Sequence, residues 1–168
     1  MVNRSWAPLG ADRFFATINA GFYNQSAFFR VAPGFVVQFG ISGSKVREGI
    51  TSLTSPRPTP TLNLVHAARQ TENEKWLHSE IPDDPVKMSN TPGTLVYADA
   101  GKNTRSTQLF INYGNNARLD AMGFSPFAKV VGSSGMQVAT KIFNPTPGQS
   151  MGKATCGHSL AHAVGICL

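Results

Sequence analysis

Cysteine is scarce in this sequence: the only two are Cys156 and Cys167, both close to the C-terminal end. A single pair cannot supply the disulfide framework of a small secreted protein, which favours a reducing compartment. Long apolar runs are also missing, and none approaches the roughly 20 residues that a membrane-spanning helix needs. The first residues lack the apolar core of a secretory signal. We therefore expect a cytoplasmic protein that does not contact membranes.

Acidic residues are few, and basic residues are scattered. The 15 Lys and Arg outnumber the 9 Asp and Glu, which gives a formal net charge of +6. No basic run or helical stripe gathers these charges, so we expect no nucleic-acid partner. A chain of 168 residues with 41% hydrophobic content can bury a sizeable core, and we expect one domain over residues 1–168 and a monomer.

The common catalytic motifs are absent as well. The sequence has no phosphate-binding loop, no dinucleotide glycine fingerprint and no His-Glu-x-x-His, and none of its four histidines lies beside a nucleophile motif. The tail carries Cys156, His158, His162 and Cys167, which are zinc-ligand types, but their spacing matches no common finger. Incidental ligands in a small apolar tail are the alternative, and we expect neither a metal nor a cofactor.

What is present is a series of short strands with two helices. The helical spacing of Ala11, Phe14, Phe15 and Ile18 predicts a helix over 7–20 with these residues on its apolar face, and a second helix is predicted over 135–143. β-branched and aromatic runs predict strands at 28–31, 35–39, 94–98, 107–111 and 127–131. Alternate prolines from Pro56 to Pro60 indicate an extended loop within an insertion at about 49–73. These elements predict a mainly β protein with an antiparallel sheet closed into a barrel or sandwich.

The hairpin around Pro33-Gly34 holds two polar side chains, Arg30 and Gln38, among apolar neighbours. Burying a guanidinium and an amide is costly unless both find partners. One interpretation is an edge hairpin whose arginine lies along the surface. The other is an apolar groove with a hydrogen-bonding pair at its floor.

Four blocks in order resemble cyclophilin-type peptidyl-prolyl isomerases. They run from Gly21 to Gly40, from Asn90 to Ile111, over Leu119-Asp120, and from Phe127 to Gly132 leading to Met136. The resemblance covers about residues 7–48 and 74–147. It implies an eight-stranded closed antiparallel barrel with two capping helices. We expect this barrel to be incomplete, because nothing before Trp6 resembles the first two strands and the tail at about 151–168 does not resemble the last.

The resemblance also implies the activity, which is rotation about X-Pro bonds in peptides and folding proteins. Arg30 matches the catalytic arginine of the family, and Gln38 matches the glutamine that binds the peptide carbonyl. The implied substrate-binding residues are Phe35, Val36, Ala98, Asp99, Ala100, Gln108, Phe110, Leu119 and Phe124, with Gly123 an alternative for Phe124. Because the wall residue Asp99 and the barrel depart from the family pattern, a weak or inactive proline-peptide binding module or assembly scaffold is the alternative function.

Overall fold

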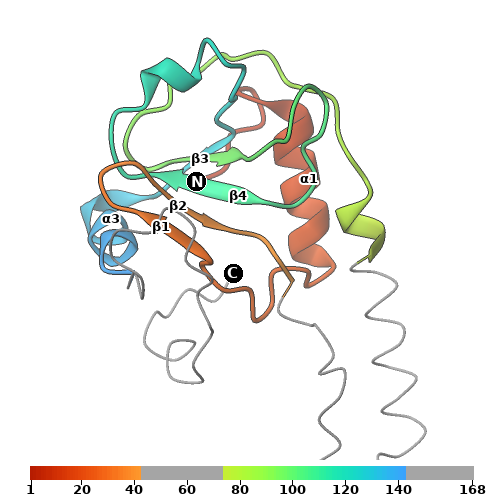
Figure 1. The fold of residues 1–168 in the computed structure, drawn as a ribbon, viewed down its shortest axis with the longest axis horizontal. Helices are drawn as coiled ribbons and strands as arrows, with labels where there is room; N and C mark the ends of the chain where they lie inside the picture. Colours follow the sequence, from red (N-terminus) through yellow and green to blue (C-terminus); the bar gives the residue numbers. More distant parts are fainter. Residues whose placement is uncertain (43–73, 143–168) are drawn as a thin grey trace, which may run out of the picture.

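The computed structural model describes residues 1–42 and 74–142, so the insertion at 49–73 and the tail at 151–168 lie outside the described residues (Figure 1). The first element is helix α1, Pro8–Asn19. It follows Ala7 in extended conformation and has Pro8 in its first turn, where a missing N–H costs nothing. It ends before Gly21, whose φ of 68° suits a residue without a side chain.

The inward face of α1 is formed by Gly10, Ala11, Phe14 and Thr17, all buried. The periodicity also placed Phe15 on the apolar face, and this was wrong, because the residue is 52% exposed. Thr17 takes the remaining inward position, since its hydroxyl donates to the carbonyl oxygens of Arg13 and Phe14 within the helix. A local hydrogen bond lets a polar side chain occupy an interior site.

Five short strands form one sheet, in the order β1-β2-β4-β3-β5. Every pairing between neighbouring strands is antiparallel. The strands are β1 Arg30–Ala32, β2 Val36–Phe39, β3 Thr94–Tyr97, β4 Leu109–Asn112 and β5 Ala128–Lys129. The predicted antiparallel sheet is confirmed, with strand ends displaced by one or two residues and β5 reduced to two.

The described part of this sheet is open. β1 and β5 are its two ends and do not pair with each other. Val2 forms an isolated bridge with Ala128, and the N–H of Lys129 donates to the carbonyl of Met1, so the first residues extend the sheet beyond β5. A closed barrel is therefore not seen in the described residues and stays a prediction.

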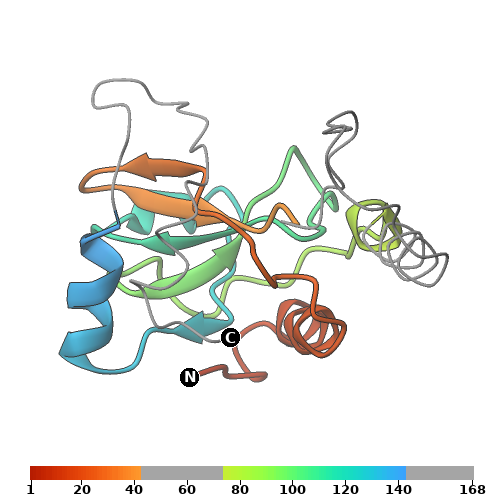
Figure 2. The same ribbon diagram turned by 90° about the horizontal axis from the view of Figure 1, so that it is seen from below.

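Helix α3 spans Gly132–Thr140 and lies at the opposite end of the sheet from α1 (Figure 2). It begins three residues earlier than its periodicity predicted. Ala139 is its buried residue, and Met136 packs on the core. Between β4 and β5, residues Ala117–Leu119 form a one-turn 3-10 helix, η1. No helix among the described residues is long and apolar enough to cross a bilayer.

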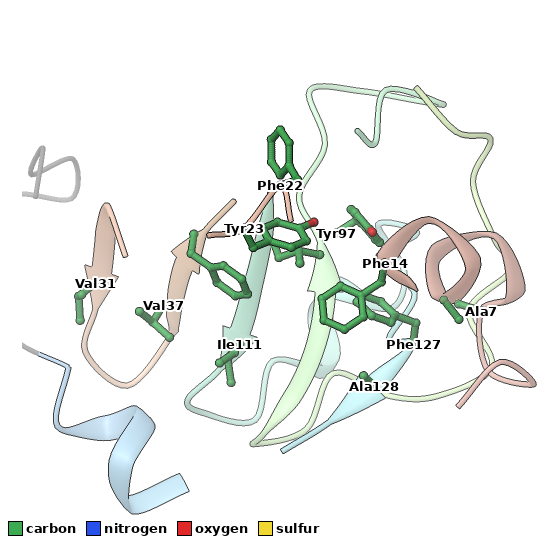
Figure 3. Packing of buried hydrophobic residues seen from close by; sticks show 13 residues of the cluster. Ala7, Phe14, Phe22, Tyr23, Val31, Val37, Tyr97, Ile111, Phe127 and Ala128 are labelled. Carbon is green, nitrogen blue, oxygen red and sulfur yellow. The ribbon is translucent and has the colours of Figure 1, made fainter. Parts of the chain in front are cut away.

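The two faces of the sheet have separate apolar clusters. Val31, Val37, Tyr97, Leu109 and Ile111 lie on one face and join Phe14 and Phe127 in the main core (Figure 3). Ring contacts connect this core, with centroids 5.2 Å apart between Phe14 and Phe127 and between Tyr97 and Phe127. Because successive strand residues point to opposite faces, the alternate residues of the same strands are left for the other face.

Candidate functional site

The face of the sheet away from the main core carries a second apolar group, here called the outer cluster. Its buried members are Val36, Val96, Phe110 and Leu119, and Ala32, Phe35, Ala98 and Phe124 pack against them partly exposed. The strand register explains the grouping, since Phe110 of β4 pairs with Gln38 of β2 on one side and Val96 of β3 on the other.

Two residues from the segment between β4 and β5 complete this cluster. Leu119 comes from η1, and Phe124 comes from the segment that follows it. The ring of Phe124 meets that of Phe110 edge-on, with centroids 5.7 Å apart and an angle of 68° between the planes. Such an edge-to-face pair is a favoured aromatic geometry. Six of the nine residues predicted to bind the substrate therefore lie in one apolar group.

A row of polar side chains borders the outer cluster. Arg30 of β1 pairs in register with Gln38 of β2, and its Nη1 donates to Gln38 Oε1 over a long 3.4 Å. Gln38 Nε2 donates in turn to Gln108 Oε1 at 2.9 Å. The guanidinium carbon of Arg30 lies 5.8 Å from the ring centroid of Phe35, within the range of a cation–π contact. The catalytic pair proposed from the sequence thus lies directly beside the apolar group.

Buried amides connect the loops around the cluster to the sheet. Asn112 is fully buried in β4, and its Nδ2 donates to Asn90 Oδ1 and Thr94 Oγ1 while its Oδ1 accepts from Asn116 Nδ2. Asn116 Nδ2 also donates to the carbonyl of Phe35 at 2.9 Å, and the N–H of Leu119 donates to the carbonyl of Asn116 at 2.8 Å. This amide network joins the segments that present Phe35 and Leu119.

Asp120 anchors the same network from the other side. Its carboxylate accepts hydrogen bonds from Ser89 Oγ and from the backbone and side-chain nitrogens of Asn90. Burial opposes ionisation of this carboxyl, but the hydrogen bonds from Ser89 and Asn90 outweigh it and lower its pKa. The Asn90 amide also donates to the carbonyl of Phe124, which fixes the second segment of the cluster.

A buried arginine holds the remaining wall. The side chain of Arg105 is only 6% exposed and forms ion pairs with Asp83 and with Asp99, the second at 2.7 Å. It also donates to the carbonyl of Gly123 at 2.9 Å, and its guanidinium carbon lies 5.7 Å from the ring centroid of Phe124. One cation therefore joins the 83–84 turn, the 99–105 loop and the segment before Phe124.

The predicted wall residues divide into two groups. Ala98 packs on the outer cluster, and its N–H donates to the carbonyl of Gln108 at 2.9 Å. Asp99 instead directs its carboxylate to Arg105, and Ala100 is exposed with its N–H donating to Thr104 Oγ1. Asp99 and Ala100 therefore follow the cluster residue Ala98 in the sequence, but neither of them belongs to the outer cluster.

Sequence reasoning missed several residues of this region. The period-two pattern of β3 and β4 would have placed Val96 and Asn112 on the outer face, because each lies two residues from an assigned position. Arg105 gave no local signal, since its carboxylate partner Asp83 lies far away in the sequence. Arg118 was noticed as a departure from the family pattern but was given no role in substrate binding, although its guanidinium carbon lies 4.8 Å from the ring centroid of Phe35. Within the described residues, no group of three or more His, Cys, Asp or Glu could hold a metal ion.

Comparison with known proteins identifies the family of this chain. The family model described as "Cyclophilin type peptidyl-prolyl cis-trans isomerase/CLD" matches residues 2–157. The chain belongs to the cyclophilin family. Peptidyl-prolyl cis-trans isomerase A of Dickeya dadantii is similar, with 33% identity over 141 residues, which cover 81% of this chain and 60% of the relative. A peptidyl-prolyl cis-trans isomerase of Acinetobacter baylyi is 30% identical over 143 residues, 82% of this chain and 62% of its own.

Solved structures agree with the fold of a cyclophilin. A cyclophilin-type isomerase of Cryptosporidium parvum, crystallised in the presence of the dipeptide Ala-Pro, superposes with a TM-score of 0.61. The match covers 92% of this cyclophilin and 84% of that chain at 19% identity, so it bears on the fold alone. This chain spans about 60% of the length of the two bacterial relatives.

Proposed function

We propose that this cyclophilin accelerates rotation about X-Pro bonds in peptides and folding proteins. One observation carries the proposal: Arg30 and Gln38 pair in register and lie beside an apolar cluster that contains Phe35, Val36, Phe110 and Leu119. The names of the relatives support the same activity. The crystal of the Cryptosporidium protein with Ala-Pro supports proline-containing peptides as the ligands.

The chemistry needs neither a covalent step nor a cofactor. Rotation about the amide bond meets a barrier of about 18–20 kcal/mol because the planar form is stabilised by resonance. Twisting the bond ends this resonance and returns a lone pair to the prolyl nitrogen. A site that binds the twisted form better than the planar one therefore accelerates the reaction in both directions.

Arg30 supplies that preference in the proposed mechanism. Its guanidinium donates to the prolyl nitrogen only when the lone pair is localised, which is a stabilisation specific to the transition state. Gln38 accepts from Arg30 and donates to Gln108, and this row orients the guanidinium and leaves amide groups for the peptide carbonyl. The outer cluster receives the proline ring, whose burial contributes about 1.5–3 kcal/mol.

The backbone of the peptide lies along Ala98, Asp99, Ala100 and Gln108 in this proposal, with Phe124 at the end of the wall. Asp99 contributes through its backbone, because its carboxylate is paired with Arg105. We further propose that the protein acts as a monomer and in the cytoplasm, and that its sheet belongs to a closed barrel. The superposition on a solved cyclophilin supports this proposal, because the family resemblance implies a barrel.

The test measures the rate of cis/trans exchange in a short Ala-Pro-Phe peptide. A protease-coupled assay and NMR exchange spectroscopy both report this rate. We expect Arg30→Ala to lower kcat/KM about 100-fold or more, as removal of one transition-state donor does. Arg4→Ala is the matched control, because Arg4 forms an exposed ion pair with Asp12 on α1. Equal activity of the wild type and Arg30→Ala would contradict the catalytic assignment.

The same samples test the alternative of a proline-peptide binding module. Peptide-induced chemical-shift changes in residues of the outer cluster, without faster exchange in the peptide, would favour binding alone. The observation behind this alternative is the open sheet of the described residues.

A further inference from the structure

Arg118 is a cationic side chain at the rim of the outer cluster. It directly precedes Leu119 in η1, so its backbone is held by the turn that buries Leu119 against Phe110. Its side chain is exposed, and the guanidinium carbon lies 4.8 Å from the ring centroid of the partly exposed Phe35. A cation–π contact of this kind restrains a long side chain while its N–H edge remains able to donate.

The carboxylates of the loops around the cluster are engaged elsewhere. Asp99 and Asp83 pair with Arg105, and Asp120 accepts from Ser89 and Asn90. Within residues 1–42 and 74–142, Arg118 forms no ion pair and donates no hydrogen bond. Its positive charge is therefore not neutralised by the parts of the protein that form the site.

We infer that Arg118 selects substrates in which an acidic side chain lies next to the proline. The inference rests on the proposed function, because it places the proline ring in the outer cluster. Phe35 belongs to that cluster, and Arg118 lies over its ring, so a peptide with its proline docked there brings a neighbouring side chain to the guanidinium. Arginine binds carboxylates in a two-pronged geometry and repels a second cation.

The expected preference is modest because the contact is exposed to solvent. Exposed ion pairs contribute a few tenths to about 1 kcal/mol, so we expect a preference of roughly three- to fivefold for Glu over Gln beside proline. The preference should weaken as salt rises, since charges in water are screened over about 10 Å at 0.1 M. A peptide with Lys in the same position should have a lower kcat/KM than the peptide with Gln.

The experiment uses peptides that differ in one residue, either before or after proline, where Glu, Gln or Lys is placed. Both kcat/KM and the Kd from NMR titration are measured for the wild type, Arg118→Gln and Arg118→Glu, at 20 mM and 500 mM salt. Lys129→Gln is the control, because it removes one positive charge from an exposed residue of β5. We expect the Glu/Gln ratio to fall to about one in Arg118→Gln, to invert in Arg118→Glu and to persist in Lys129→Gln.

A ratio near one in the wild type, or a ratio that Arg118→Gln leaves unchanged, overturns the inference. These results are distinct from a failure of the proposed function, which would appear as a wild type that accelerates none of the peptides. The Kd ratios still decide the role of Arg118 in that case, because they depend on docking and not on rotation.

Discussion

Asn112 provides the sharpest test of how the site is held together. Its side chain is completely buried in β4 and makes three hydrogen bonds, at 3.0 Å to Asn90, 2.8 Å to Thr94 and 2.7 Å from Asn116. Replacement by alanine removes all three, at about 1 kcal/mol each. The side-chain oxygen Oδ1 of Asn90, a residue that is also buried, loses the donor that Asn112 supplies. We expect Asn112→Ala to lower the free energy of unfolding by about 3 kcal/mol.

The measurement is urea unfolding followed by tryptophan fluorescence. Asn24→Ala is the matched control, because Asn24 is exposed and the same atoms are removed; such surface changes usually stay within about 0.5 kcal/mol. We also expect a coupling energy of at least 1 kcal/mol between Asn112→Ala and Asn90→Ala, since the two side chains share a hydrogen bond and a network.

Two results would refute this reasoning. A loss in Asn112→Ala no larger than that in Asn24→Ala would show that the network contributes little to stability. Strict additivity of Asn112→Ala and Asn90→Ala would show that the two amides do not act together. The proposed isomerase activity is a second quantity to measure. Asn116, which bonds to Asn112, also donates to the carbonyl of Phe35 and accepts from the N–H of Leu119. Activity should therefore fall in Asn112→Ala at temperatures where the protein is still folded.

Two further predictions concern buried ionisable groups. Arg105→Leu should lower the free energy of unfolding by about 3 kcal/mol, because it leaves Asp83 and Asp99 without their shared cation. The control Arg4→Leu, which breaks an exposed ion pair, should lower it by less than about 1 kcal/mol. Equal losses for the two variants in urea unfolding would contradict the prediction. Burial raises the pKa of Tyr23 and of Tyr113 to about 12 and that of Tyr97 further, so the native protein should show no phenolate absorbance step near pH 10. Because the unfolded chain ionises its tyrosines from about pH 10, stability should fall as the pH rises from 10 through 12, and a phenolate step at pH 10 in folded protein would refute the assignment.

The strands could be predicted because they depend on local patterns, whereas the members of the outer cluster were implied by the resemblance to cyclophilins. Alternation in β2 and β4 separates Val36 and Phe110 from Val37 and Ile111, and the register then brings Phe110 opposite Gln38. Pro8 and Gly21 mark the ends of α1 almost to the residue. Phe15 was misplaced since periodicity describes one face of a helix but not where its edge meets solvent.

The hairpin of Arg30 and Gln38 shows what a resemblance adds to a pattern. Pattern alone favoured the edge hairpin over a hydrogen-bonding pair in a groove, because a groove cannot be recognised from a single pair of strands. The structure has features of each: β1 is the end of the described sheet, and Arg30 is half-buried with Gln38 as a hydrogen-bond partner. The family blocks from Ala98 to Leu119 decide between them by supplying the apolar group that adjoins the pair.

The charges of the site could not be predicted, because they depend on contacts between distant loops. Arg105 pairs with Asp83 only since Ile81 and Arg105 form a bridge that brings the two loops together. The same cation engages Asp99, so an acidic residue in the expected peptide wall presents little free negative charge. The preference for an acidic peptide therefore follows from which carboxylates the fold has already paired, and the formal charge of +6 spread over the sequence carries no such information.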